Sequence, residues 1–262
     1  MRAALALICL FFGQITAAQP VEVDVKIVIS VDASGSVDPT EFRLQIGGIV
    51  NAMRDQNVQR AVRAGPKGRV LAAVLIWSDA AYPKYPTAWF ELWPEGSFEA
   101  FATEIEKFTI SAPGVPAIGG GGTNIGDGLL YAINMLGDNP VPASRLVIDV
   151  SGDGPESKPW VKGAVELPQA RALATAKGIT VNGLAIETDI AGLHLWYEAN
   201  LITGAGSFVE KAADFQDYQQ AIIKKLLREL SGQPFTRNGP LRGQQMGQHI
   251  GDGRAHQESA KG

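Results

Sequence analysis

The stretch VEVDVKIVISVDASGS, residues 21–36, joins an expected strand to a loop of oxygen-bearing side chains. Residues 21–31 first alternate between apolar and polar and then become wholly apolar, as in a strand that enters a buried sheet. After the strand, Asp32, Ser34 and Ser36 form a D-x-S-x-S pattern. These three side chains reach one centre only through a tight turn, which the glycine between the serines eases. The stretch predicts a buried strand with polar groups at its carboxyl end.

A helix is predicted directly after this loop. Asp38 is expected to cap it, Pro39 suits the first helical position, and Glu41 can reach back to the cap. Apolar residues then recur at helical spacing and form one stripe: Phe42, Ile46, Ile49, Val50 and Met53.

Strands and helices alternate along the rest of the chain. Strands are predicted over 70–77, 146–150, 179–186 and 207–210, with an edge strand over 85–92 that Pro86 interrupts. Helices are predicted over 98–108, 125–136, 165–176 and 193–201, and a last one is capped by Asp214 and ends at Leu230. This order predicts an α/β fold with a doubly wound, mostly parallel sheet, helices on both faces and one antiparallel edge strand.

The two ends of the chain differ from the middle in composition. Residues 1–18 combine a charged start, a short apolar run and small residues before Gln19, which predicts a signal peptide. The folded domain is expected over 19–230. Residues 231–262 are rich in Gly, Gln, Arg and Ser, and we expect this tail to be disordered. The chain is therefore expected to be exported, to the periplasm or outside the cell, which is compatible with a bacterial source.

Composition narrows the class of partner. The chain has 262 residues, 45% of them hydrophobic, 19% charged, and a net charge of −4. This balance is that of a globular protein and argues against a nucleic-acid partner. Its single cysteine, Cys9, lies in the predicted signal peptide, so neither a disulfide nor a thiolate metal site is expected in the mature chain. No later run reaches the length of a membrane span.

Three loops carry the candidate metal ligands. They are the loop after the first strand, the Gly122-Thr123-Asn124 segment before a helix, and the Ser151-Gly152-Asp153-Gly154 segment after the 146–150 strand. In a doubly wound sheet such loops converge at the carboxyl ends of the strands. Two carboxylates and three hydroxyls suit a hard cation, Mg²⁺ with Mn²⁺ or Ca²⁺ as alternatives, over zinc or copper. The predicted ligands are Asp32, Ser34, Ser36, Thr123 and Asp153.

This pattern resembles the metal-ion-dependent adhesion site (MIDAS) of the von Willebrand factor A superfamily. The resemblance covers residues 23 to 230. Within the superfamily, the chain resembles uncharacterised secreted bacterial members. It implies that the three hydroxyls contact the metal, that the two aspartates bind it directly or through water, and that an Asp or Glu of a protein partner completes the sphere. In the family, the threonine loop and the last helix shift together. Ser151 and Gly152 depart from the pattern, because other members often have a threonine there.

Four further residues are candidates for the rim of the binding surface: Asn124, Glu156, Trp160 and Glu187. The two glutamates follow strands, and we expect them to be solvated. Trp160 follows the Asp153 loop and is the best placed of the tryptophans to contact a ligand.

The favoured function is a binding module, not an enzyme. The alternative is a Mg²⁺-dependent phosphohydrolase. Such an enzyme needs a second acidic residue two positions after the aspartate nucleophile, and this chain has Ser34 at that position after Asp32. No G-x-S-x-G motif is present, and His194 is the one histidine of the predicted domain. A third hypothesis, an assembly factor with an inert site, would be marked by a lost ligand, and none is lost.

Overall fold

The computed structural model describes residues 21–93, 95–108, 121–157 and 161–231. It contains a seven-stranded sheet in the order β3-β2-β1-β5-β6-β7, with β4 also paired to β2. The strands are β1 (Val23–Asp32), β2 (Val70–Trp77), β3 (Tyr85–Pro86), β4 (Phe90–Leu92), β5 (Ala143–Gly152), β6 (Thr180–Ile186) and β7 (Val209–Ala212). Pairs among β1, β2, β5, β6 and β7 are parallel. The predicted fold class is confirmed.

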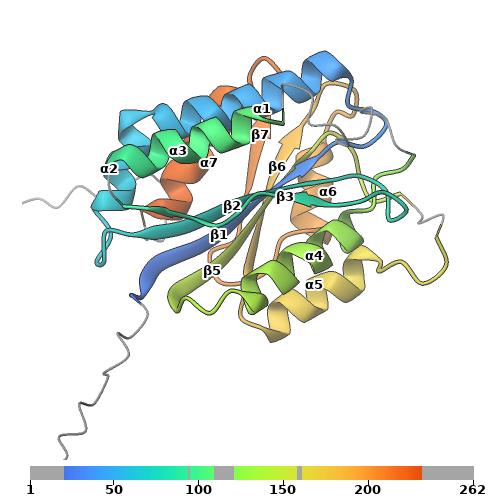
Figure 1. The fold of residues 1–262 in the computed structure, drawn as a ribbon. Helices are drawn as coiled ribbons and strands as arrows, with labels where there is room; N and C mark the ends of the chain where they lie inside the picture. Colours follow the sequence, from blue (N-terminus) through green and yellow to red (C-terminus); the bar gives the residue numbers. More distant parts are fainter. Residues whose placement is uncertain (1–20, 94, 109–120, 158–160, 232–262) are drawn as a thin grey trace, which may run out of the picture.

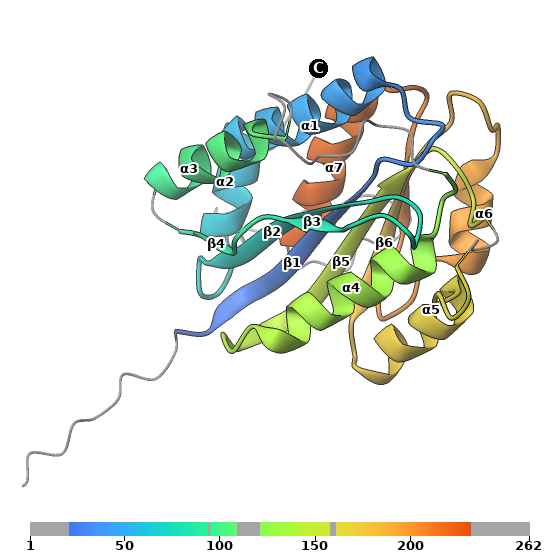
Figure 2. The ribbon, with the colours of Figure 1, turned by 45° about the vertical axis from the view of Figure 1, so that its right-hand side comes forward.

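Helices cover both faces of this sheet (Figure 1, Figure 2). One face carries α1 (Pro39–Arg54), α2 (Gln56–Arg63), α3 (Glu95–Glu106) and α7 (Tyr218–Leu230). The other carries α4 (Ile125–Asp138), α5 (Leu167–Ala176) and α6 (Leu193–Asn200). The sheet therefore separates two apolar cores. The α1 stripe fills the first, and Trp77, which is 1% exposed, lies in the second.

The antiparallel edge is split into two short strands where one was predicted. β3 and β4 both pair with β2, and Thr87 lies between them. The Thr87 hydroxyl accepts the N–H of Val74 at 3.0 Å, and the Thr87 N–H donates to the Val74 carbonyl at 2.9 Å. Pro86 has no N–H to donate. At Thr87 the Val74 N–H donates to the side-chain hydroxyl and not to a backbone carbonyl, so regular strand pairing stops there.

The predicted cap of α1 is confirmed. Asp38 accepts the N–H groups of Thr40 and Glu41, and the Glu41 carboxylate accepts the Asp38 N–H at 2.8 Å. The sequence prediction missed α2, although Asp55 caps it by accepting from Asn57 and Val58.

The predicted cap of the last helix was wrong. α7 begins at Tyr218, and Asp214 instead accepts the Asp217 N–H at 2.9 Å. Asp217 in turn accepts the Ala213 N–H at 3.1 Å. The two aspartates therefore form a turn that precedes the helix.

A buried charge cluster fixes α7 on the sheet. Lys225 on α7 is fully buried and forms ion pairs with Asp149 of β5 and, at 2.7 Å, with Glu229. Asn182 of β6 donates to Glu229 at 2.7 Å. Burial, followed by the charge of Glu229, raises the pKa of Asp149, so this cluster keeps a proton at pH values where a surface carboxyl has lost it.

Within the described part of the chain, no helix has the length and apolar character needed to cross a bilayer. The predicted signal peptide lies outside the described residues, as does the predicted tail beyond Ser231.

Candidate metal centre

The five predicted ligands lie together at the carboxyl ends of β1 and β5. The Ser36 hydroxyl donates to Asp153 Oδ1 at 2.8 Å, and the Thr123 hydroxyl donates to the Ser34 hydroxyl at 3.1 Å. The two serine hydroxyls are 3.4 Å apart, and Asp32 Oδ1 accepts the Ser34 N–H at 2.8 Å. Three loops that are distant in sequence thus share one hydrogen-bonded network.

Asp32 is the buried centre of this network. Its side chain is 0% exposed, and its Oδ2 atom has no hydrogen-bond partner among the described residues. Burial, followed by the charge of Asp153, raises the pKa of Asp32 to about 8. A buried carboxylate oxygen without a donor is costly, and a cation beside it would remove that cost.

Asp153 is in a similar electrostatic position. It is 4% exposed, and burial raises the pKa of its carboxyl, although the Ser36 hydroxyl that donates to it acts in the opposite direction. Both carboxyl groups therefore hold a proton more tightly than a surface carboxyl does. A cation bound beside them would favour their ionised forms.

Close backbone approach is built into the site. A methyl group on Gly152 would lie 2.8 Å from Asp32 Oδ2 and 2.8 Å from the Tyr197 hydroxyl. One on Gly35 would lie 2.9 Å from the carbonyl oxygen of Gly121. Both positions therefore need glycine so that the loops can pack against one another.

The Thr123 loop is held from two sides by residues that the sequence analysis missed. The Ser157 hydroxyl accepts the Thr123 N–H at 2.7 Å, and the Ser157 N–H donates to the Thr123 carbonyl at 2.8 Å. On the other side, Asp79 accepts the N–H of Gly122 at 3.2 Å and that of Ala81 at 2.8 Å. The available signal for Asp79 was an acidic residue two positions after the end of the buried β2 strand.

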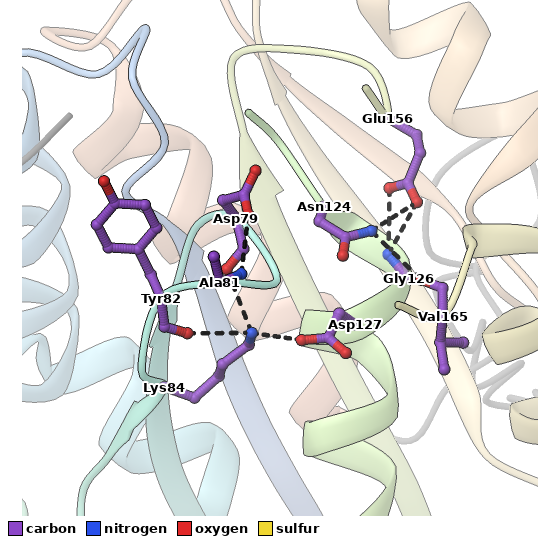
Figure 3. Close-up of polar contacts among 9 residues, drawn as sticks. All are labelled: Asp79, Ala81, Tyr82, Lys84, Asn124, Gly126, Asp127, Glu156 and Val165. Carbon is purple, nitrogen blue, oxygen red and sulfur yellow. Dashed lines mark hydrogen bonds and ion pairs between the residues drawn. The ribbon is translucent and has the colours of Figure 1, made fainter. Parts of the chain in front are cut away.

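A lysine ties the Asp79 turn to α4 (Figure 3). Lys84 Nζ donates to the carbonyl oxygens of Asp79 and Tyr82, both at 3.3 Å, and forms an ion pair with Asp127 in the first turn of α4. Its side chain is only 7% exposed. The loop after β2 and the helix that follows Thr123 are thereby joined.

The chain matches one protein-family model over most of its length. A family model described as "Protein of unknown function (DUF1194)" matches residues 22–234. The chain belongs to the DUF1194 family. A search of curated proteins finds no match.

Solved structures share the fold of this DUF1194 protein at low sequence identity. The pilus adhesin SpaC from Lactobacillus rhamnosus GG matches with a TM-score of 0.55 and 15% identity, over 80% of this chain and 31% of the adhesin. Proximal thread matrix protein 1 from the mussel byssus, with a zinc-occupied MIDAS motif, matches with a TM-score of 0.53 and 16% identity, over 81% of this chain and 48% of that protein. A second crystal form of the mussel protein gives 0.50 and 19%, over 81% and 46%. The chain thus spans less than half of each, and its fold is von Willebrand factor A-like.

Glu156 of the DUF1194 chain is not the solvated residue that we expected. Its carboxylate accepts the N–H of Gly126 at 3.1 Å, at the start of α4 (Figure 3). It also accepts the N–H of Leu167 at 3.1 Å, at the start of α5. The N-cap residues of these two helices, Asn124 and Glu166, make no side-chain cap bond of their own. One carboxylate therefore caps two helices, and the missed signal was the absence of a good cap on either.

The other rim candidates differ in their surroundings. The Asn124 amide donates to Glu156 at 3.0 Å, so it belongs to the same cap. Glu187 was also expected to be solvated, which is wrong: its side chain is 5% exposed and accepts from Lys211 and His194. Burial acts to raise the pKa of Glu187, but these hydrogen bonds outweigh it and lower the pKa to about 2. Trp160 lies outside the described residues.

The residues present fit a hard divalent cation. The set offers oxygen atoms alone, and the described residues include no group of three or more His, Cys, Asp or Glu side chains suited to a metal. No cluster of thiolates or imidazoles that would hold a softer transition metal is therefore found in this part of the chain, whereas carboxylates and hydroxyls suit Mg²⁺, Mn²⁺ or Ca²⁺.

Proposed function

We propose that this DUF1194 protein is a binding module that recognises a protein partner through one divalent cation held by Asp32, Ser34, Ser36, Thr123 and Asp153. One observation carries the proposal: all five side chains belong to a single network in which the buried Asp32 Oδ2 has no donor among the described residues. In a network that only stabilised the fold, a hydrogen-bond donor to that oxygen would be expected.

The residues of the set have different roles in this proposal. The hydroxyls of Ser34, Ser36 and Thr123 are neutral ligands, and Asp32 and Asp153 bind the ion directly or through water. Bound in this way, Mg²⁺ (or Mn²⁺ or Ca²⁺) supplies an electrophilic position for an Asp or Glu side chain of the partner. Where the hydroxyls hold the ion directly and the two carboxylates act through water, the ion keeps much of its charge and can attract a carboxylate of the partner.

The proposed place of action is outside the cytoplasm. It rests on the predicted signal peptide over residues 1–18. The similarity to a pilus adhesin and to a matrix protein of the mussel byssus agrees with a binding role in the periplasm or outside the cell.

Calorimetric titration of the chain from residue 19 onward with Mg²⁺ and Mn²⁺ tests the metal site. We expect one ion per chain, no binding by Asp32→Ala, and unchanged binding by Glu198→Gln, which alters an exposed carboxylate of α6. Circular dichroism of each variant verifies folding. A folded Asp32→Ala variant that binds the ion as the wild type does would overturn the site.

Partner binding needs a separate measurement. The immobilised protein is exposed to a cell-envelope extract with Mg²⁺ or with a chelator, beside immobilised Asp32→Ala. We expect a partner that is retained by the wild type in Mg²⁺ and lost in the other two cases. A partner that stays bound in chelator, with the protein folded, would exclude metal-bridged recognition. A panel of phosphatase and esterase substrates under the same conditions tests the hydrolase alternative.

A further inference from the structure

A basic hollow lies at the end of the sheet opposite the metal centre. Its volume is about 290 Å³, and it is lined by Arg63, Lys67, Gly68, Arg69 and Trp93. Val70, which follows Arg69, pairs with Val25 near the start of β1, whereas Asp32 pairs with Trp77 at the carboxyl ends. We propose that this hollow binds a phosphate or sulfate group carried by a sugar.

The turn that presents two of the cations is fixed by a buried carboxylate. Asp24 is 8% exposed, and both of its oxygens lie 3.0 Å from the Lys67 N–H that donates to them. The Arg69 N–H donates to the same carboxylate at 3.3 Å. Backbone N–H groups thus satisfy the Asp24 carboxylate, and the side chains of Lys67 and Arg69 stay in the lining of the hollow. Such fixed backbone geometry lowers the ordering cost of binding.

Gly68 keeps the hollow open. Its φ angle is +65°, a conformation that other residues adopt only with strain, and it adds no side chain to the lining. The side chains of Arg63, Lys67 and Arg69 therefore line a space to which Gly68 adds no side chain.

Two ion pairs at the hollow, those of Arg69 and Lys67, are weak competitors for a ligand. Arg69 Nη1 contacts Glu91 at 2.7 Å, and Lys67 Nζ contacts Glu22 at 3.1 Å. Both glutamates are nearly half exposed, at 45% and 48%. Exposed pairs of this kind contribute about 0–1 kcal/mol each, so an anionic ligand can replace them.

The arrangement favours a tetrahedral oxyanion over a carboxylate. Arg63 ends α2, Lys67 lies in the following turn, and Arg69 precedes β2, so the charges come from three segments. A phosphate or sulfate group offers three outward oxygens, whereas a planar carboxylate is matched by one arginine. Among the described residues that line the hollow, none is acidic.

Trp93 supplies the surface for the rest of the ligand. Its side chain is 40% exposed, and the Arg69 guanidinium lies 4.3 Å from the ring centroid, which orients that arginine. The exposed part of the indole that Arg69 does not cover suits the apolar C–H surface of a sugar ring. The expected ligand class is therefore a sugar phosphate or a sulfated sugar.

Titration with glucose 6-phosphate and glucose 6-sulfate at low salt tests this inference, with inorganic phosphate and glucose as references. We expect one site for each charged sugar, weaker binding of inorganic phosphate and none of glucose. Arg69→Ala should lower the affinity at least about tenfold, and Arg63→Ala serves as a second variant if Arg69→Ala fails to fold. Trp93→Ala should remove the advantage of the charged sugar over inorganic phosphate.

Two controls separate this site from simpler explanations. Arg43→Ala removes an exposed arginine of α1 and should leave binding unchanged, and Asp32→Ala should leave it unchanged as well. Absence of binding at ligand concentrations on the order of 10 mM would overturn the proposal. An equal loss in Arg43→Ala would also overturn it, because attraction by general charge would then account for the binding.

Discussion

Ser36 donates a hydrogen bond of 2.8 Å to Asp153, a residue 117 positions away in the chain. The contact joins the loop after β1 to the loop after β5, two strands that pair in parallel from Val23 to Val31. Because the strands are adjacent and run in the same direction, their carboxyl ends bring the two loops together. The candidate metal centre is thus a direct product of sheet order.

Gly152→Ala should damage the site. The added methyl group would lie 2.8 Å from Asp32 Oδ2, so we expect a loss of about 1–3 kcal/mol in the free energy of unfolding and a clear loss of Mg²⁺ affinity. Gly154→Ala is the matched control, because its methyl group would meet only Thr123 Oγ1 at an ordinary 3.7 Å. Denaturant titration and calorimetry measure both effects. Equal behaviour of the two variants would contradict the close packing.

The affinity for Mg²⁺ should rise with pH. In the metal-free protein Asp32 has a pKa of about 8, so a proton must leave before the carboxylate binds a cation. We expect the affinity to increase between about pH 6 and pH 8 and then to level off. Calorimetry in buffers of different ionisation enthalpy counts the released proton. A pH-independent affinity would show that Asp32 is already ionised.

The same pKa predicts the stability of the metal-free protein. The folded value lies above the ordinary value near 4, so the folded state binds the proton more tightly and stability falls as the pH rises from about 4 to about 8. Asp32→Asn should flatten that part of the profile, which urea titration in chelator measures. An unchanged slope would assign the pH dependence to other groups.

Glu156→Gln should destabilise the fold without abolishing Mg²⁺ binding. Glutamine retains one acceptor oxygen for two helix starts and loses the charge that favours them, so we expect a cost of about 1–2 kcal/mol. Glu166→Gln is the control: Glu166 is exposed and makes no side-chain cap bond, so its change should cost less than about 0.5 kcal/mol. Loss of metal binding in a folded Glu156→Gln variant would instead make Glu156 part of the metal centre.

Lys225→Met should be among the most destabilising single changes. It leaves Asp149 and Glu229 buried without a cation, at a cost of about 3–5 kcal/mol. The neighbouring Lys224→Met removes a side chain that is 73% exposed and should cost at most about 1 kcal/mol. Combining Lys225→Met with Asp149→Leu and Glu229→Met should restore much of the loss, since no unpaired charge remains. Failure of that rescue would show that packing, and not charge, makes Lys225 important.

The order of elements and the candidate ligands followed from local sequence patterns. Apolar runs such as residues 70–77 identify buried strands, and Asp38 with Glu41 identifies a helix start, because these signals depend on neighbours along the chain. The D-x-S-x-S turn is equally local. By contrast, β3 and β4 separate at Thr87 because of a contact with Val74 on another strand, which no local pattern contains.

Local patterns in the sequence are enough to predict the α/β class, most of the helices and strands, and a set of candidate oxygen ligands at the ends of particular strands. Which of the nearby polar side chains already have hydrogen-bond partners within the protein depends on the tertiary fold. Glu156 and Glu187 look in sequence like Asp153, an acid that follows a strand, yet they accept hydrogen bonds from distant backbone and side-chain donors. Asp32 Oδ2 finds no such donor among the described residues. The difference arises because a hydrogen bond depends on which atoms the fold brings within about 3 Å, and sequence separation carries no such information.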